Sequence, residues 1–251
     1  CAPSNQINIS PQNFNFQQSA ALPLVGLTAI QCLKYDYKLQ KDQKLLLIGA
    51  SGGVGHVALQ VAKSMGAKVS CICSGKNIDY VEDLGADYCM DYTNGEDWLL
   101  EQLQKDVVLN QKYDLIFDCV SSIESKDQSL NYYDLVAKNN LLSDDGKYIT
   151  IGGSTFNWFR AGMKRTIGLN CFGSKHELFW VRFPNSTDAL EELRQIVDDG
   201  KLDIRIAQII DAKELGNSDG FSTEGLCEAF KLLQERRVKG KIVLKIFDED
   251  Q

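Results

Sequence analysis

The sequence predicts an α/β protein built on a doubly wound parallel sheet, and three observations support this prediction. Short apolar runs alternate with segments of helical apolar spacing between Leu45 and Gly153. The first run, Leu45 to Ile48, is apolar throughout, as in a parallel strand that is covered on both faces. A glycine-rich stretch, "GASGGVG", then joins this run to a helical pattern. A strand, a tight turn and a helix therefore open the predicted sheet.

The other elements follow in order along the chain. After the glycines, apolar residues from Val54 to Met65 recur at helical spacing, and Gly66 stands where a helix would end. Further strands are predicted at 68–73, 88–90, 113–120 and 146–153. The helices between them are predicted within 77–87, at 97–108 and at 131–138. Because alternating strands and helices are joined by right-handed crossovers, these strands form one parallel sheet.

The pattern changes on either side of this region. Residues 154–183 are rich in aromatic residues and irregular, and two amphipathic helices are expected around 190–197 and 226–233. Residues 240–246 predict a last strand. Residues 1–18 hold two of the four prolines and many Asn and Gln residues, so we expect them to be extended.

Composition and charge exclude several classes of protein. The 251 residues are 44% hydrophobic and 24% charged, and the net charge of -7 argues against nucleic acid or an anionic membrane as partner. No apolar run approaches the length that spans a bilayer. The eight cysteines form no C-x-x-C pair and only two histidines accompany them, so we predict structural thiols in a reducing compartment and no metal site.

The glycine-rich stretch predicts a site for a dinucleotide. Glycines let a pyrophosphate approach the backbone, and the helix that follows presents free N–H groups and positive partial charge. In the G-x-G-x-x-G register the key positions are Ala50, Gly52 and Gly55, so alanine replaces the first glycine. The candidate cofactor contacts in the turn are Ala50, Ser51, Gly52, Gly53, Val54 and Gly55. Packing alone is the alternative reason for such glycines.

Two other nucleotide-binding classes do not fit. A short-chain dehydrogenase needs a Y-x-x-x-K pair well downstream of the glycines, and the one match, Tyr37 to Lys41, precedes them. A P-loop needs Gly-Lys-Ser/Thr after the turn, which is absent.

Several segments together resemble one known family, the zinc-less medium-chain reductases of the quinone oxidoreductase type. The resemblance is carried by "AALPLVGLTAIQCL", "GASGGVGHVALQVAKSMGAKV", "LGADYCMDY", "YDLIFDCV", "GKYITIGG" and "GKIVLKI". These segments follow the family order from Ala20 to Ile246. They are similar in particular to the reticulon-4-interacting protein and zeta-crystallin-like subgroup.

The resemblance implies a two-domain enzyme in which a barrel-like catalytic domain precedes a Rossmann-type cofactor domain. We therefore expect an extended lead-in at 1–23, the dinucleotide-binding domain at 24–166, and at 167–251 a C-terminal segment that returns to the truncated barrel-like domain. The catalytic domain itself is expected to be missing. The last strand should then lack its partner, and either a homo-oligomer or a partner subunit would cover the exposed surface.

The tip of the second strand predicts NADPH as cofactor. An acidic residue there would bind the ribose of NAD, whereas this chain has Ser74, Gly75 and Lys76. The resemblance implies that Ser74 and Tyr92 contact the 2′-phosphate. The alternative is that Lys76 is a solvated surface charge and Tyr92 a capping aromatic. Further candidate cofactor contacts at the ends of later strands are Val120, Gly152 and Gly153.

Other residues of interest have competing interpretations. His56 is expected to be structural, and His176 either lines the nicotinamide side or packs with Phe179, Trp180 and Phe183. Phe156, Trp158 and Phe159 either flank a flat substrate or belong to the core. Arg160, Lys164 and Arg165 are read as a solvated face that would also suit an acyl-carrier phosphate.

The resemblance implies an NADPH-dependent, zinc-independent oxidoreductase that transfers a hydride to a quinone or to an activated C=C or carbonyl acceptor. An enoyl-thioester reductase is the first alternative, and a non-catalytic cofactor-binding or structural subunit is the second. No catalytic residue can be assigned, and a small molecule is the expected acceptor. The location is expected to be cytoplasmic or mitochondrial. Because the missing catalytic domain would form the part of the cleft that holds the acceptor, the chain alone should turn over acceptors poorly.

Overall fold

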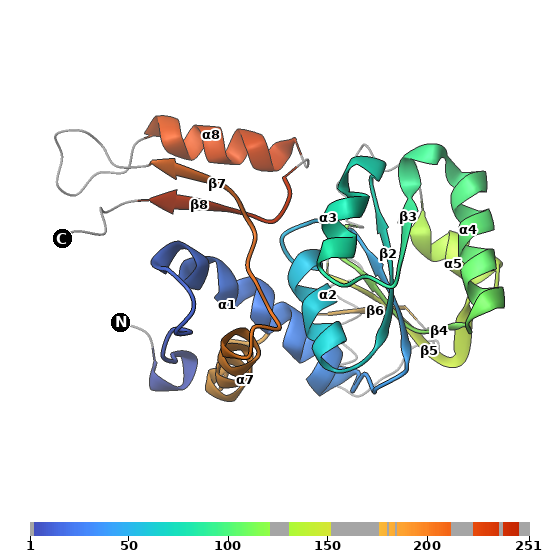
Figure 1. Ribbon diagram of the computed structural model, residues 1–251, viewed down its shortest axis with the longest axis horizontal. Coiled ribbons are helices and arrows are strands. Elements are labelled where there is room, and N and C mark those ends of the chain that lie inside the picture. Colours follow the sequence, from blue (N-terminus) through green and yellow to red (C-terminus); the bar gives the residue numbers. More distant parts are fainter. Residues whose placement is uncertain are drawn as a thin grey trace, which may run out of the picture.

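The computed structural model describes residues 3–120, 131–151, 176–179, 181–183, 185–211, 223–235 and 238–245. Its main body is an α/β unit with helices on both faces of a central sheet (Figure 1). A smaller unit of two strands and one helix, β7, β8 and α8, stands beside it, next to α1 (Figure 1).

The central sheet has six parallel strands in the order β3-β2-β1-β4-β5-β6. The strands are β1 Lys44–Ile48, β2 Lys68–Cys73, β3 Tyr88–Asp91, β4 Tyr113–Asp118, β5 Leu142–Thr150 and β6 His176–Leu178. The order reverses between β1 and β4, which makes the sheet doubly wound. The predicted fold class is confirmed, although β5 begins earlier than expected and β6 was not foreseen.

Both faces of the sheet are buried, as the unbroken apolar run of β1 predicts. Leu45 and Leu47 belong to the core on the side of α1 Phe16–Ile30 and α2 Gly55–Ser64. Leu46 and Ile48 point to the opposite face, where they pack with residues of α4 and α5. Successive strand residues alternate between these two cores because the side chains of a strand have a period of two.

The other described helices lie close to their predicted positions. They are α3 Ile78–Asp83, α4 Glu96–Leu109, α5 Tyr132–Lys138, α7 Thr187–Asp198 and α8 Thr223–Gln234. Short 3₁₀ turns occupy Ser4–Gln6, Gly75–Asn77 and Tyr92–Asn94. The helix boundaries follow the predicted caps, since Gly66 and Gly200 each follow the end of a helix with positive φ.

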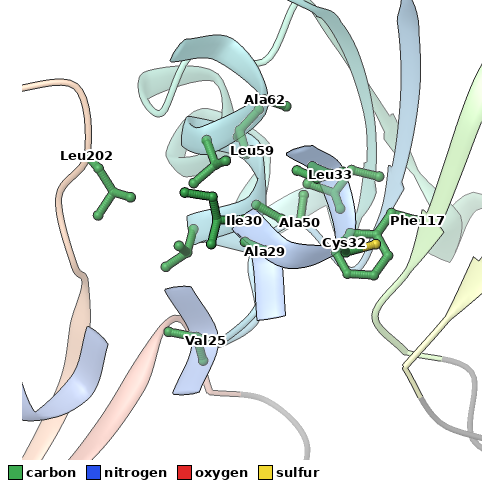
Figure 2. Packing of buried hydrophobic residues seen from close by; sticks show 14 of the residues in the cluster. Val25, Ala29, Ile30, Cys32, Leu33, Ala50, Leu59, Ala62, Phe117 and Leu202 are labelled. Carbon is green, nitrogen blue, oxygen red and sulfur yellow. The ribbon is translucent and has the colours of Figure 1, made fainter. Parts of the chain in front are cut away.

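The extended lead-in is wrong from Phe16 onwards, because helix α1 begins there and continues into the π-helical segment Gln31–Asp36. Asn15 caps α1 by accepting a hydrogen bond from the Gln18 N–H, and the Gln18 side chain accepts one from the Asn15 N–H in return. The last turns of α1 are buried against α2 (Figure 2). The cluster drawn there includes Val25, Ala29, Ile30, Cys32, Leu33, Ala50, Leu59, Ala62, Phe117 and Leu202.

The last strand, β8 Lys241–Lys245, pairs in parallel with β7 Ile206–Asp211. The expectation that this strand lacks a partner is therefore wrong. Strand β7 was missed because its apolar pairs, Ile206–Ala207 and Ile209–Ile210, are separated by Gln208 and form neither an unbroken apolar run nor a strict alternation.

A buried ion pair holds the opposite end of the sheet from the glycine turn. The Lys44 ammonium lies 2.9 Å from an Asp106 carboxylate oxygen, and both side chains are almost fully buried. The same carboxylate accepts hydrogen bonds from the hydroxyls of Ser70 (2.6 Å) and Tyr113 (2.7 Å). Burial raises the pKa of Asp106, but the hydrogen bonds from Ser70, Lys44 and Tyr113 outweigh it, so the net pKa is lowered.

We predict that Asp106→Ala lowers the free energy of unfolding by about 3–5 kcal/mol, because it leaves the Lys44 charge buried and unpaired. The double variant Lys44→Met/Asp106→Leu should recover most of this loss. Urea denaturation of both variants measures the difference, and equal stabilities would contradict the pairing.

The stability that Asp106 contributes depends on pH, because its pKa is lower in the folded state. Its stabilisation is complete above the ordinary aspartate pKa of about 3.9 and is lost as the pH falls through the folded value. We expect this acid-dependent loss in the wild type and not in the double variant.

Candidate functional site

The turn between β1 and α2 contains two glycines at which the packing of the protein leaves no room for a side chain. Gly49 has a positive φ of 80°, and a Cβ built on it would lie 2.3 Å from Val120 Cγ2. A Cβ on Gly55 would lie 2.2 Å from the Gly49 carbonyl oxygen and 2.8 Å from Ala50 Cα. No side chain fits at Gly55, so helix α2 starts directly against the end of β1. These two glycines therefore support the packing interpretation.

Gly52 differs, because space remains beside it, whereas a Cβ on Gly53 would meet the Lys241 side chain. Within the described chain, a Cβ on Gly52 would meet one atom within 4 Å, the Gly49 carbonyl oxygen at 3.3 Å. The N–H groups of Gly53 and Val54 donate to no described residue. Free N–H groups at the start of a helix, beside a surface without side chains, form a cradle that fits a phosphate. The glycine turn thus fits the pyrophosphate of a dinucleotide.

The C-terminal segment brings a cation to this turn. The Gly240 N–H donates to the Ser51 carbonyl (3.1 Å), and a Cβ on Gly53 would lie 3.2 Å from Lys241 Cδ and 3.9 Å from its Nζ. The Lys241 ammonium has no ion-pair or hydrogen-bond partner among the described residues, and burial lowers its pKa. Lys241 was not predicted as a site residue, since only the folded chain brings it next to residue 53.

Ser74 and Tyr92 follow the carboxyl ends of the neighbouring strands β2 and β3. Lys76 is exposed, and its carbonyl accepts a hydrogen bond from Lys239 Nζ at 3.1 Å. Lys239 is a second cation that the sequence did not point to. The Tyr92 side chain is 42% exposed, so it is available to a ligand at this edge.

A carboxylate does stand near the tip of β2, although it comes from β3. A Cβ on Gly75 would lie 2.2 Å from Asp91 Oδ2. The expectation that no acid is close is therefore correct for the neighbours of Ser74 in the sequence, but not for its neighbours in the folded chain. Asp91 Oδ1 accepts hydrogen bonds from the Thr93 N–H (2.9 Å) and hydroxyl (2.7 Å). Burial raises the pKa of Asp91, but the hydrogen bonds from Thr93 and Gly75 outweigh this effect, so the net pKa is lowered. Protein donors thus already hold this carboxylate.

Val120 lies at the same edge, after β4, and packs against Gly49. Its N–H donates to Asp118 Oδ1 (2.9 Å), and the Tyr148 hydroxyl donates to Asp118 Oδ2 (2.6 Å). Asp118 is fully buried, so it fixes the start of the loop that Val120 begins. Val120 was predicted at the end of this strand, whereas the role of Asp118 was not predicted.

Several predicted residues lie outside the described part of the chain. They are Gly152, Gly153, Phe156, Trp158, Phe159, Arg160, Lys164, Arg165 and Trp180, together with the side chain of His176. Of the aromatic residues that are described, Phe179 is buried in the core and Phe183 is 47% exposed. A packing role is therefore confirmed for Phe179.

His56 is fully buried at the start of α2, and its ring ties this helix to a distant segment. Its Nε2 accepts a hydrogen bond from the Arg205 N–H (3.3 Å), so its Nδ1 carries the proton and donates to the Gly52 carbonyl (2.9 Å). Burial lowers the pKa of His56. These contacts confirm the structural role that the sequence analysis favoured.

No group of three or more His, Cys, Asp or Glu residues in the described part of the chain is arranged to hold a metal ion. No described helix is long and apolar enough to cross a membrane.

Comparison with known proteins agrees with this geometry. The family described as "Zinc-binding dehydrogenase" matches residues 84–244, which is more than half of the chain, so the chain belongs to this family. The chain is similar to a chloroplast envelope quinone oxidoreductase homolog of Arabidopsis thaliana, with 32% identity over 81% of the chain and 56% of that protein. It is also similar to the mitochondrial NAD(P)H oxidoreductase RTN4IP1 of Danio rerio, with 28% identity over 98% of the chain and 61% of that protein.

Two further similarities bear on the type within the family. A trans-enoyl reductase of Aspergillus terreus, pgmF, is 27% identical over 91% of the chain and 59% of its own length. The structure of a quinone oxidoreductase from Coxiella burnetii superposes with a TM-score of 0.71 at 25% identity, over 98% of the chain and 66% of its own. The predicted medium-chain, quinone oxidoreductase type is confirmed. The chain spans between 56% and 61% of the length of these curated relatives.

We predict that His56 is neutral and protonated on Nδ1 at pH 6, where an exposed histidine is about three-quarters charged. Nitrogen-detected NMR of the imidazole measures this state, and a His176→Asn variant assigns the two signals. Because the pKa of His56 is lowered in the folded state, its contribution to stability is complete above about pH 6.5 and is lost as the pH falls through the lower folded-state pKa. A charged His56 at pH 6 would contradict the hydrogen-bond assignment.

Proposed function

We propose that this chain binds NADPH as part of a zinc-independent oxidoreductase that reduces a quinone or an activated C=C or carbonyl compound. The nicotinamide would supply the hydride. The residues of this chain would bind the cofactor and hold it at the carboxyl edge of the sheet, which is where open α/β sheets bind ligands. The domain boundary at 166/167 belongs to this proposal, whereas the boundary expected at 23/24 falls within helix α1.

The observation that supports the proposal most strongly is the cradle at Gly52 and Gly53. It combines free N–H groups, the open space beside Gly52 and the Lys241 ammonium close by. Each of these features favours a phosphate, and a purely structural turn needs none of them. Ala50, Ser51 and Val54 complete the turn, while Gly55 contributes by letting the helix start close to the strand.

The preference for NADPH over NADH rests on charge at the neighbouring edge. Lys76 and Lys239 lie together beside Ser74, and the nearby carboxylate of Asp91 is held by Thr93 and Gly75. A 2′-phosphate placed here would meet two cations and the Tyr92 side chain. A free ribose hydroxyl would find no uncommitted acid at Gly75.

The relatives favour two acceptor classes. The protein from Coxiella burnetii is named as a quinone oxidoreductase, that from Arabidopsis thaliana as a quinone oxidoreductase homolog, and pgmF as a trans-enoyl reductase. We propose a quinone or related acceptor first and an enoyl thioester second. Steady-state NADPH oxidation by the whole protein, with matched panels of quinones and enoyl thioesters, separates these two. The proposed location is the cytoplasm or the mitochondrion.

We predict that the chain binds NADPH at least about tenfold more tightly than NADH, which corresponds to about 1.4 kcal/mol. Isothermal titration calorimetry at fixed salt measures both affinities. Lys76→Gln/Lys239→Gln should narrow the preference, whereas Lys138→Gln, whose exposed side chain pairs within α5, should leave it unchanged. Equal affinities in the wild type would refute the preference, and no binding of either would refute the site.

We predict that Gly52→Val raises the Kd for NADPH by more than roughly 100-fold, or about 2.8 kcal/mol, because its side chain would fill the cradle. The fold should survive, since a Cβ on Gly52 meets only one nearby atom of the described chain. Gly55→Ala is the matched variant and should instead destabilise the protein by about 1–3 kcal/mol. Unchanged affinity in folded Gly52→Val would show that the register is wrong.

A further inference from the structure

Cys71 on β2 and Cys89 on β3 are paired directly across two neighbouring parallel strands. Side chains at paired positions point to the same face of a sheet, and neighbouring strands lie ~4.8 Å apart. A disulfide needs Cα atoms roughly 4.4–6.8 Å apart. The two cysteines thus lie within this range at its short end, and reaching the usual separation of about 5.5–6 Å requires only a small widening between the strands.

The two thiols are not equally accessible. Cys71 is fully buried, and burial is the main cause that raises its pKa. Cys89 is partly exposed, and the hydrogen bond from Cys71 lowers its pKa. Cys73, also on β2, is buried as well and is paired with Asp91 instead. Cys89 is therefore the thiol of the pair that a small oxidant reaches first.

We propose that Cys71 and Cys89 form a dithiol site that hydrogen peroxide oxidises to a disulfide between β2 and β3. The Cys89 thiolate attacks one peroxide oxygen, the O–O bond breaks, and hydroxide leaves, which gives a sulfenic acid on Cys89. The Cys71 sulfur then attacks the Cys89 sulfur. The sulfenic oxygen leaves with the Cys71 proton as water, so that two thiols and one peroxide give one disulfide and two waters.

The position of this pair ties it to the cofactor edge. Ser74 lies three residues after Cys71 and Tyr92 three residues after Cys89, so the two cysteines join the strands that carry both proposed phosphate contacts. This coupling rests on the proposed function, whereas the disulfide itself does not. Bound NADPH would hold Ser74 and Tyr92 at their reduced-state spacing. It should therefore slow closure of the disulfide.

Peptide mapping of the wild-type chain tests the proposal without any variant. The reduced chain is treated with hydrogen peroxide, alkylated and digested with trypsin, which releases residues 69–76 and 77–105 as separate peptides. We expect these two peptides to appear linked, two hydrogens lighter than the reduced pair, and to separate on treatment with dithiothreitol. Fragmentation between Cys71 and Cys73 locates the bond. No linked peptide, or a bond to Cys73, would overturn the proposal.

Matched variants and NADPH complete the test. Cys73→Ser should keep the linked peptide, while Cys71→Ser should lose it and leave a sulfenic acid that dimedone traps on Cys89. A linked peptide that persists in Cys71→Ser would contradict the assignment. In the wild type, saturating NADPH, with binding checked first by calorimetry, should slow formation of the linked peptide at least about twofold. An unchanged rate with NADPH bound would overturn the coupling while leaving the dithiol intact.

Discussion

The close approach of helix α2 to the end of strand β1 is the constraint on which the rest of the site depends. Gly55 lies so near the Gly49 carbonyl that no Cβ fits between them. A helix that starts this close to the strand directs its first N–H groups across the edge of the sheet, and Gly52 keeps the space before them free. The same contact therefore fixes the packing of the core and creates the cradle for an anion.

Helix α2 also positions the cation beside that cradle. Its residue Gln60 exchanges hydrogen bonds with the backbone of Asp203 (2.8 and 2.9 Å), and His56 accepts one from the Arg205 N–H. The Arg205 carbonyl in turn accepts the Lys241 N–H (2.8 Å). A chain of backbone and side-chain bonds thus runs from α2 through residues 203–205 to Lys241, which stands next to Gly53. Loss of any link would loosen the side of the site that the C-terminal segment forms.

The sequence predicted the parallel sheet and the glycine turn because both depend on local patterns. Apolar runs and helical spacing are set by neighbours in the chain, and the register of the glycines follows from them. Helix α1 was not predicted because its apolar residues are nearly continuous and Pro23 interrupts them. Asn15 and Gln18 do form a capping box that could have indicated its start. A different reason explains why three site residues were not predicted, namely Lys241, Lys239 and Asp91. Each reaches the site from a distant or neighbouring element, and no periodicity records a tertiary contact.

A crystal structure of the chain with NADPH tests the central claim most directly. The account predicts that the pyrophosphate oxygens accept hydrogen bonds from the N–H groups of Gly53 and Val54, with the Lys241 ammonium beside them. The 2′-phosphate should lie between Ser74, Lys76 and Tyr92. A dinucleotide bound away from the glycine turn, or bound there with its adenosine end turned away from Ser74, would contradict the account.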